Sequence, residues 1–294
     1  MNLKSALFNF KLLPLIALFL SIEGIPAMAQ QTNPMEMAKT SGYAPVNGIN
    51  MYYEMYGNGE IPLVLIHGGG STIEVTFANI LPIFSKHNKV IAVELQAHGR
   101  TSDRDAPESF EQDADDVAAL LKYLKVGKAN ILGFSNGGTT SLQIAIRHPE
   151  MVNKFIDVAG AYQREGFIPG FFDGFKGATI DKMPAPLQTA FLKVNPDHDK
   201  LMNMFHKDVA RMVNFKDIPD ETIRGIKAQA LIIVGSQDVM PVEHAIKLSH
   251  LIAGAQLMVL PGVHGTCLGE ATTWKPGSKQ PEATAILIQE FLDE

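Results

Sequence analysis

Cysteine is almost absent from this chain of 294 residues. Cys267 is the only one, so no internal disulfide can form. The same scarcity excludes a zinc site built from paired cysteines. With 46% hydrophobic and 19% charged residues, the composition is that of a globular protein whose stability comes from its apolar core.

The sequence also has no excess of positive charge. It contains 25 Lys and Arg residues and 31 Asp and Glu residues, which gives a formal net charge of −6 at neutral pH. A nucleic-acid partner would call for a clustered basic face. We therefore expect no nucleic-acid partner.

The apolar segment near the N-terminus is too short for a membrane span. It covers residues 12–22 and stops before Glu23, whereas a spanning helix needs about 20 apolar residues. Lys4 and Lys11 precede it, as basic residues precede the apolar part of a secretory signal. An uncleaved membrane anchor is the alternative interpretation.

The segment is followed by Ala27-Met28-Ala29, which has small residues at the two positions that a signal peptidase recognises. We expect residues 1–29 to be a signal peptide, with cleavage before Gln30. The mature protein would then be exported, to the periplasm or the medium, without stable membrane association.

Short apolar runs recur along the rest of the chain. They occupy residues 62–66, 90–93, 131–132, 155–156, 231–234 and 257–260. Such runs are typical of parallel strands that are buried on both faces. Ahead of them, Asn47-Gly48 predicts a tight hairpin turn, and the partly alternating residues 49–56 predict an antiparallel strand.

Helical patterns separate these strands. Residues 109–112 have the form of a capping box and precede an apolar stripe. Further helices are predicted at residues 139–148, from Pro241 onward, and at residues 282–292. Alternating strands and helices predict an α/β fold with a mainly parallel sheet and helices on both faces.

One interval interrupts the alternation. Residues 160–222 lack the pattern of a buried strand, and residues 187–194 and 201–213 read as helices. We interpret 160–222 as a helical cap inserted into a core made of residues 30–159 and 223–294. An ordinary excursion packed away from the active end is the alternative.

The candidate nucleophile is Ser135. It stands in Gly133-Phe134-Ser135-Asn136-Gly137, directly after an apolar run. Glycines on both sides permit a sharp strand-to-helix turn that exposes the serine hydroxyl at the end of a sheet. A serine hydroxyl still needs a base and a group that orients the base.

Both partners follow later strands. Asp238 comes after residues 231–234, and His264 comes after residues 257–260. The order serine, acid, histidine, with each at a strand end, predicts a catalytic triad of Ser135, Asp238 and His264. Asp157 at the end of the preceding strand is the alternative acid.

The oxyanion of such a reaction needs backbone N–H donors near the serine. Asn136, directly after the nucleophile, should supply one. The loop His67-Gly68-Gly69-Gly70 should supply the second, from Gly69 or alternatively Gly70. We expect His67 to orient this loop through hydrogen bonds without transferring protons.

Taken in this order, the motifs resemble the α/β-hydrolase superfamily, in its serine esterase or lactonase-like branch with a helical cap. Residues 94–101 add to the likeness, because they resemble a Gly-His-Gly-Arg-Ser turn, with Ala97 and Thr101 as departures. The resemblance covers the chain from Tyr43 onward and implies the α/β-hydrolase fold.

The resemblance implies hydrolysis of a carboxylic ester or lactone of small to medium size through an acyl-enzyme, with no metal or cofactor. A serine nucleophile argues against dehalogenases and epoxide hydrolases, which use an aspartate. A carbon–carbon bond hydrolase and a proline-type aminopeptidase share the triad, and the peptidase would need acidic cap residues such as Glu165 or Asp173. A cofactor-free haloperoxidase or perhydrolase and a non-catalytic binding protein are weaker alternatives.

The cap is rich in Phe and Met, which favours an apolar and adaptable substrate pocket. We expect its lining to include Phe167, Phe171, Met204 and Phe205. These side chains could instead form a small core of the cap. The sequence leaves the oligomeric state open.

Overall fold

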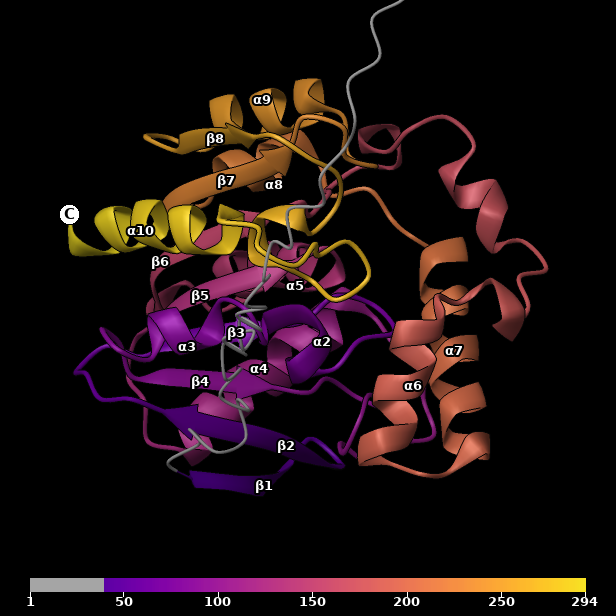
Figure 1. Ribbon diagram of the computed structural model, residues 1–294. Coiled ribbons are helices and arrows are strands. Elements are labelled where there is room, and N and C mark those ends of the chain that lie inside the picture. Colours follow the sequence, from indigo (N-terminus) through magenta and orange to yellow (C-terminus); the bar gives the residue numbers. More distant parts are fainter. Residues whose placement is uncertain (1–39) are drawn as a thin grey trace, which may run out of the picture. The chain divides into compact units, whose positions relative to one another are not determined.

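The computed structural model describes residues 40–294 (Figure 1). The signal peptide expected at residues 1–29 lies outside the described residues. Within 40–294, no helix combines the length and the apolar character that crossing a membrane requires.

The core is one eight-stranded sheet with the strand order β1-β2-β4-β3-β5-β6-β7-β8. The strands β1 and β2 are antiparallel to their neighbours, and all pairings from β4 to β8 are parallel. This confirms the predicted mainly parallel sheet. The strands are β1 (Thr40–Val46), β2 (Ile49–Tyr56), β3 (Leu63–Ile66), β4 (Val90–Val93), β5 (Ala129–Phe134), β6 (Val152–Val158), β7 (Gln229–Gly235) and β8 (Gln256–Leu260).

The hairpin between β1 and β2 turns at the predicted dipeptide. Asn47 and Gly48 both have positive φ, at 43° and 85°. Two successive positive φ values define the type I′ turn, whose twist matches that of the flanking strands.

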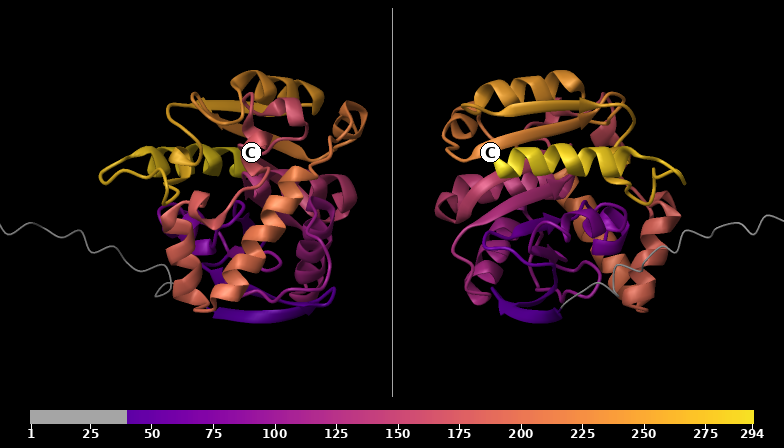
Figure 2. Two further views of the ribbon diagram at one scale, coloured as in Figure 1. Left: turned by 90° about the vertical axis from the view of Figure 1, so that its right-hand side faces the viewer. Right: turned by 60° about the vertical axis from the view of Figure 1, so that its left-hand side comes forward.

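Helices cover both faces of the sheet, with α3 packed against α10 on one face and α4 against α5 on the other (Figures 1 and 2). The Ser109 hydroxyl accepts a hydrogen bond of 3.1 Å from the N–H of Gln112, so the predicted cap begins α4. The helices of this core are α2 (Ile73–Phe77), α3 (Leu81–Phe84), α4 (Phe110–Tyr123), α5 (Asn136–Arg147), α8 (Asp220–Arg224), α9 (Val242–Leu251) and α10 (Gln280–Asp293).

The strand β8 differs from the prediction. Its run of apolar residues predicts burial on both faces, but Leu257 is 37% exposed and Val259 is 43% exposed. As the last strand, β8 pairs only with β7, and the flanking helices leave its side chains partly uncovered.

The expected insertion lies between β6 and β7. Its principal helices, α6 (Ala185–Val194) and α7 (His198–Val213), pack against each other beyond the carboxyl ends of the parallel strands (Figures 1 and 2). Short 3-10 turns at Arg164–Gly166, Phe171–Phe175 and Ile180–Lys182 precede them. The insertion therefore covers the end of the sheet where α/β proteins bind ligands.

The limits of the insertion differ slightly from those expected. The helix α7 begins three residues early, because the Asp197 side chain accepts hydrogen bonds from the N–H groups of Asp199 and Lys200. Ile218 and Ile223 already belong to the main core, so the chain rejoins it before residue 222.

Candidate active site

Ser135 occupies a strained turn between β5 and α5. Its φ and ψ are 55° and −118°, a conformation that L residues rarely adopt. A Cβ atom at Gly133 would overlap the carbonyl of Gly137, and one at Gly137 would overlap the carbonyl of Ile66. The two glycines thus allow the close approach of strand and helix that holds Ser135 at the carboxyl end of the sheet.

Asp238 and His264 form a hydrogen-bonded pair. Asp238 follows β7, and its Oδ1 accepts from Nδ1 of His264 at 2.7 Å. The Phe134 ring lies 4.7 Å from the imidazole between centroids. Because Nδ1 carries the proton in this bond, the lone pair of Nε2 is left for Ser135, which lines the same cavity as His264.

The alternative acid, Asp157, has different surroundings. It is fully buried at the end of β6, and its Oδ1 accepts from the N–H of Gly160 at 2.7 Å. Burial raises the pKa of this carboxyl to about 7. The structure brings Asp238 to the imidazole and leaves Asp157 behind the serine turn, packed against Gly138.

The amides of Gly69 and Gly70 in the glycine loop have different surroundings. The N–H of Gly70 donates to Oδ2 of Asp208, a residue of the cap helix α7. Within residues 40–294, the N–H of Gly69 has no acceptor. The N–H of Asn136, as the first residue of α5, has no partner inside its helix. Gly69 and Asn136 are therefore the amides available for an oxyanion.

His67 holds the loop from the core side. Its Nδ1 donates to the carbonyl of Gly68 at 2.7 Å, and its Nε2 accepts from the N–H of Leu95 at 3.1 Å. Complete burial lowers the pKa of His67 to about 3. A neutral ring with both nitrogens occupied fits an orienting role.

The turn at residues 94–101 brings a second histidine to this loop. Ala97 and Gly99 have positive φ, and Arg100 reaches back to pair with Glu94 at 2.7 Å. The tight turn places His98 beside Asp208, with Nε2 and Oδ2 3.0 Å apart.

Asp208 is the centre of a buried ionic cluster that sequence reasoning missed. Arg211 donates to Asp208 and, at 2.8 Å, to Asp113 of α4. Burial would raise the pKa of Asp208, but the positive charges of Arg211 and His98 outweigh it and hold the pKa well below its usual range. A signal existed in the sequence, because this acid interrupts an apolar stripe on α7 formed by Leu201, Met204, Phe205 and Met212.

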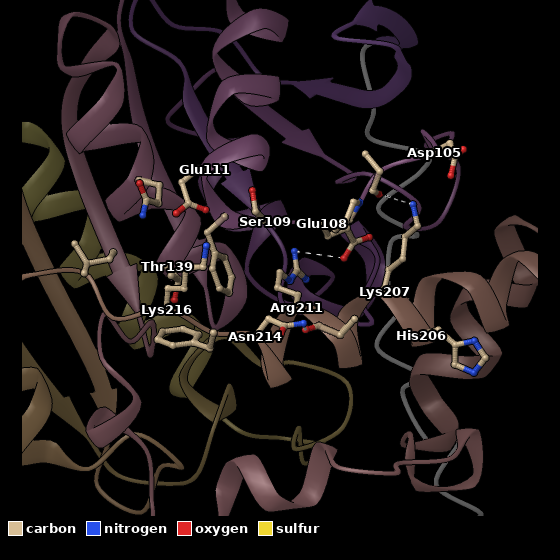
Figure 3. A pocket seen from close by; sticks show the side chains of 17 residues that line it. Asp105, Glu108, Ser109, Glu111, Thr139, His206, Lys207, Arg211, Asn214 and Lys216 are labelled. Carbon is tan, nitrogen blue, oxygen red and sulfur yellow. Dashed lines mark hydrogen bonds and ion pairs between the residues drawn. The ribbon is translucent and has the colours of Figure 1, made fainter.

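Arg211 also extends toward a second cavity of about 720 Å³, along a neighbouring face of α7 (Figure 3). There it lies 3.6 Å from the buried carboxyl of Glu108. Burial raises the pKa of Glu108 to about 8. The cluster thus ties the cap helix to the core around α4.

Ser135 and His264 open on a cavity of about 430 Å³ between core and cap. Of the four side chains expected to line it, Phe167, Phe171 and Phe205 do so. Met204 does not, and this expectation is corrected. It turns away from the cavity and is fully buried in the small core of the cap, with Phe191 and Leu201. Lining residues that the sequence did not indicate include Lys182, Met183, Asp208, Met212 and Val239.

A serine on a strained turn after β5, an acid after β7 and a histidine after β8 define the architecture of an α/β hydrolase. The chain has the fold of the α/β-hydrolase superfamily. A family model described as "alpha/beta hydrolase fold" matches residues 61–187, which include the glycine loop and the serine turn.

Among curated proteins, the chain is similar to the serine hydrolase BPHL of Homo sapiens, with 29% identity over 237 residues, 76% of this chain and 79% of the relative. It is also similar to 2-hydroxy-6-oxo-6-(2'-aminophenyl)hexa-2,4-dienoic acid hydrolase of Metapseudomonas resinovorans, with 26% identity over 79% of this chain and 87% of that one. Among solved structures, the enol-lactonase of Burkholderia xenovorans superposes with a TM-score of 0.67 at 23% identity, over 86% of this chain and 100% of the other. The structural likeness supports the fold.

Proposed function

We propose that this protein is a serine hydrolase that cleaves carboxylic ester or lactone bonds of small to medium, largely apolar substrates. The observation that carries the proposal is that His264, hydrogen-bonded to Asp238, lines the same largely apolar cavity as Ser135. Gly69 and Asn136 supply unpaired amides beside it.

In the proposed reaction, Ser135 Oγ attacks the substrate carbonyl while Nε2 of His264 takes the hydroxyl proton. The carbonyl electrons move onto oxygen, where the amides of Gly69 and Asn136 stabilise the negative charge. Collapse of this intermediate breaks the ester bond, and the leaving alkoxide takes the proton from His264. Water, deprotonated by His264, then attacks the acyl-enzyme and releases the acid with Ser135 restored.

The charges around the cavity favour an uncharged substrate. Of the titratable side chains in its wall, the Asp208 carboxylate is already paired with Arg211 and His98. The Lys182 side chain is 75% exposed. Most of the remaining lining is aromatic, aliphatic or methionine, which binds apolar acyl or alcohol groups.

An aminopeptidase would need a carboxylate free to bind the substrate amine. The two cap acids considered for this role are engaged elsewhere, Glu165 with Lys247 at 3.0 Å and Asp173 with Lys176 at 2.9 Å. Neither lines the cavity. The geometry therefore favours esters over peptides.

A carbon–carbon bond hydrolase is the second candidate. The relative from Metapseudomonas resinovorans carries the name of a dienoic acid hydrolase, and a meta-cleavage product hydrolase from Pseudomonas fluorescens shares the fold. Such a substrate bears a carboxylate, for which Lys182 is the cation in the described cavity wall.

The test is a panel of p-nitrophenyl esters, lactones, prolyl arylamides and a dienoic acid, assayed with the wild type and Ser135→Ala. We expect turnover of short-chain to medium-chain esters or lactones, and its loss in the variant. Faster turnover of the dienoic acid would replace the first proposal by the second. Turnover that persists in Ser135→Ala would contradict both.

We further propose that the protein is exported and begins at Gln30 after cleavage. The apolar residues 12–22 and the small residues before Gln30 support this.

A further inference from the structure

Two successive peptide units of the glycine loop are anchored by hydrogen bonds to side chains. The carbonyl of Gly68 and the N–H of Gly69 belong to the same peptide unit, which is planar. His67 fixes that unit by donating to the Gly68 carbonyl at 2.7 Å. The next unit, which joins Gly69 to Gly70, is fixed through the Gly70 N–H, which donates to Asp208 and lies 3.2 Å from Nε2 of His98.

A loop of three glycines needs such anchors, because glycine rotates about φ and ψ at little steric cost. Gly70 has a φ of 64°, in the left-handed region. Without the Asp208 carboxylate, the unit between Gly69 and Gly70 loses its charge-assisted hydrogen bond and can turn over through ψ of Gly69 and φ of Gly70. The loop that carries the Gly69 amide is then held on the His67 side alone by a side chain of the core. A donor for an oxyanion must keep its direction before the charge appears.

The acceptor is strong and is itself fixed. Asp208 is 8% exposed and stays ionised between the cations of His98 and Arg211, so its hydrogen bond to Gly70 is charge-assisted. Nδ1 of His98 donates to the carbonyl of Gln96 at 2.8 Å, and its Nε2 lies 3.0 Å from Oδ2 of Asp208 and 3.2 Å from the Gly70 nitrogen. The carboxylate belongs to the cap, whereas the loop belongs to the core.

From this geometry we propose that Asp208 is a positioning residue for the hydrolase. Asp208 accepts a hydrogen bond from the Gly70 amide, so that the Gly69 amide is left as the second oxyanion donor. The geometry of the oxyanion hole then depends on the packing of the cap helix α7 against the core. The inference rests on the proposed serine hydrolysis.

The test compares Asp208→Ala with two matched variants of other contacts between core and cap. Asp113→Asn alters the other carboxylate on Arg211. Asp103→Asn alters the ion pair of 2.7 Å between Asp103 of the core and Lys207 of the cap helix. Neither touches the glycine loop. We expect Asp208→Ala to lose about 10²-fold in kcat, as when one oxyanion donor is lost, with little change in KM. Both matched variants should keep kcat near that of the wild type.

A second readout reports on the oxyanion hole alone. A trifluoromethyl ketone forms a hemiketal oxyanion on Ser135, so its inhibition constant should rise in Asp208→Ala by a factor similar to the loss in kcat. The corresponding methyl ketone, which binds without adding to the serine, should bind equally to both proteins. Asp208→Asn keeps an acceptor oxygen for the Gly70 N–H. Its kcat should be about tenfold higher than that of Asp208→Ala, in line with one weaker hydrogen bond.

An unchanged kcat and an unchanged trifluoromethyl ketone constant in Asp208→Ala would overturn the inference, as would equal losses in Asp103→Asn. If Asp208→Ala does not fold, Asp208→Asn is compared with Asp113→Asn, and equal constants in those two also overturn it. Ser135→Ala separates the two proposals. Turnover retained in Ser135→Ala removes the proposed function, whereas turnover lost there but retained in Asp208→Ala removes the inference alone.

Discussion

The proton on Nδ1 of His264 lies in the hydrogen bond to Asp238, which leaves Nε2 as the ring nitrogen with a free lone pair. Asp238→Asn replaces an acceptor by an amide that can present its N–H₂ group and favour the wrong tautomer. We expect kcat on p-nitrophenyl esters to fall by about 10⁴-fold.

Asp157→Asn is the matched control for this change. The amide can still accept from the Gly160 N–H, so activity should stay close to that of the wild type. If Asp157→Asn were the more damaging variant, the acid would have been assigned to the wrong strand.

The buried imidazolium of His98 predicts a pH dependence of stability. Burial would lower its pKa, but Asp208 raises the pKa from 6.5 to about 9. A pKa raised in the folded state stabilises fully below 6.5, and this stabilisation is lost as the pH rises through 9. The stability advantage of the wild type over His98→Gln should therefore shrink between pH 7 and 9, as measured by urea unfolding. A constant difference over this range would contradict the assignment.

At the level of residues, the placement of Ser135, Asp238 and His264 near one another was predictable because each of them follows its own strand. Ser135, Asp238 and His264 are local features of three strand ends, and the fold brings strand ends together. The role of Asp208 was not predictable, because its partner Gly70 lies 138 residues away in the sequence. The hydrogen bond between them exists only when the cap packs on the core.

At the level of elements, α7 has one face toward the cavity and another toward the cap core. Phe205 lines the cavity, while the adjacent Met204 is fully buried in the core of the cap. Apolar periodicity shows that both are buried on one side, but not which neighbour each one meets. The same limit applies to β8, since a strand pattern does not state that the strand is at an edge.

A pair of substitutions tests this division of the cap. Phe171→Ala enlarges the cavity and should raise kcat/KM for longer acyl chains relative to short ones, with a small change in Tm. Met204→Ala leaves a hole in the cap core and should cost about 2–5 kcal/mol in stability with the acyl preference retained. An altered acyl preference in Met204→Ala with an unchanged Tm would show that Met204 faces the substrate.

At the level of the whole molecule, the proposed export predicts a defined mature chain. Expression of the full sequence in a bacterial host should give protein in the periplasmic fraction or the medium that begins at Gln30, as read by intact mass and N-terminal sequencing. Replacement of Ala29 by a bulky residue should block cleavage, because the peptidase reads small residues there. Full-length protein retained in the cytoplasm would contradict the proposal.

The central claim for the molecule is that core and cap together present Ser135 as an activated nucleophile. Intact mass spectrometry after treatment with an alkyl fluorophosphonate tests it most directly. The account predicts one covalent adduct per chain, mapped to Ser135 by peptide mass, and none in Ser135→Ala. It also predicts labelling slowed by orders of magnitude in His264→Gln, which lacks the base. An unlabelled wild type, or an adduct on any other residue, would contradict the account.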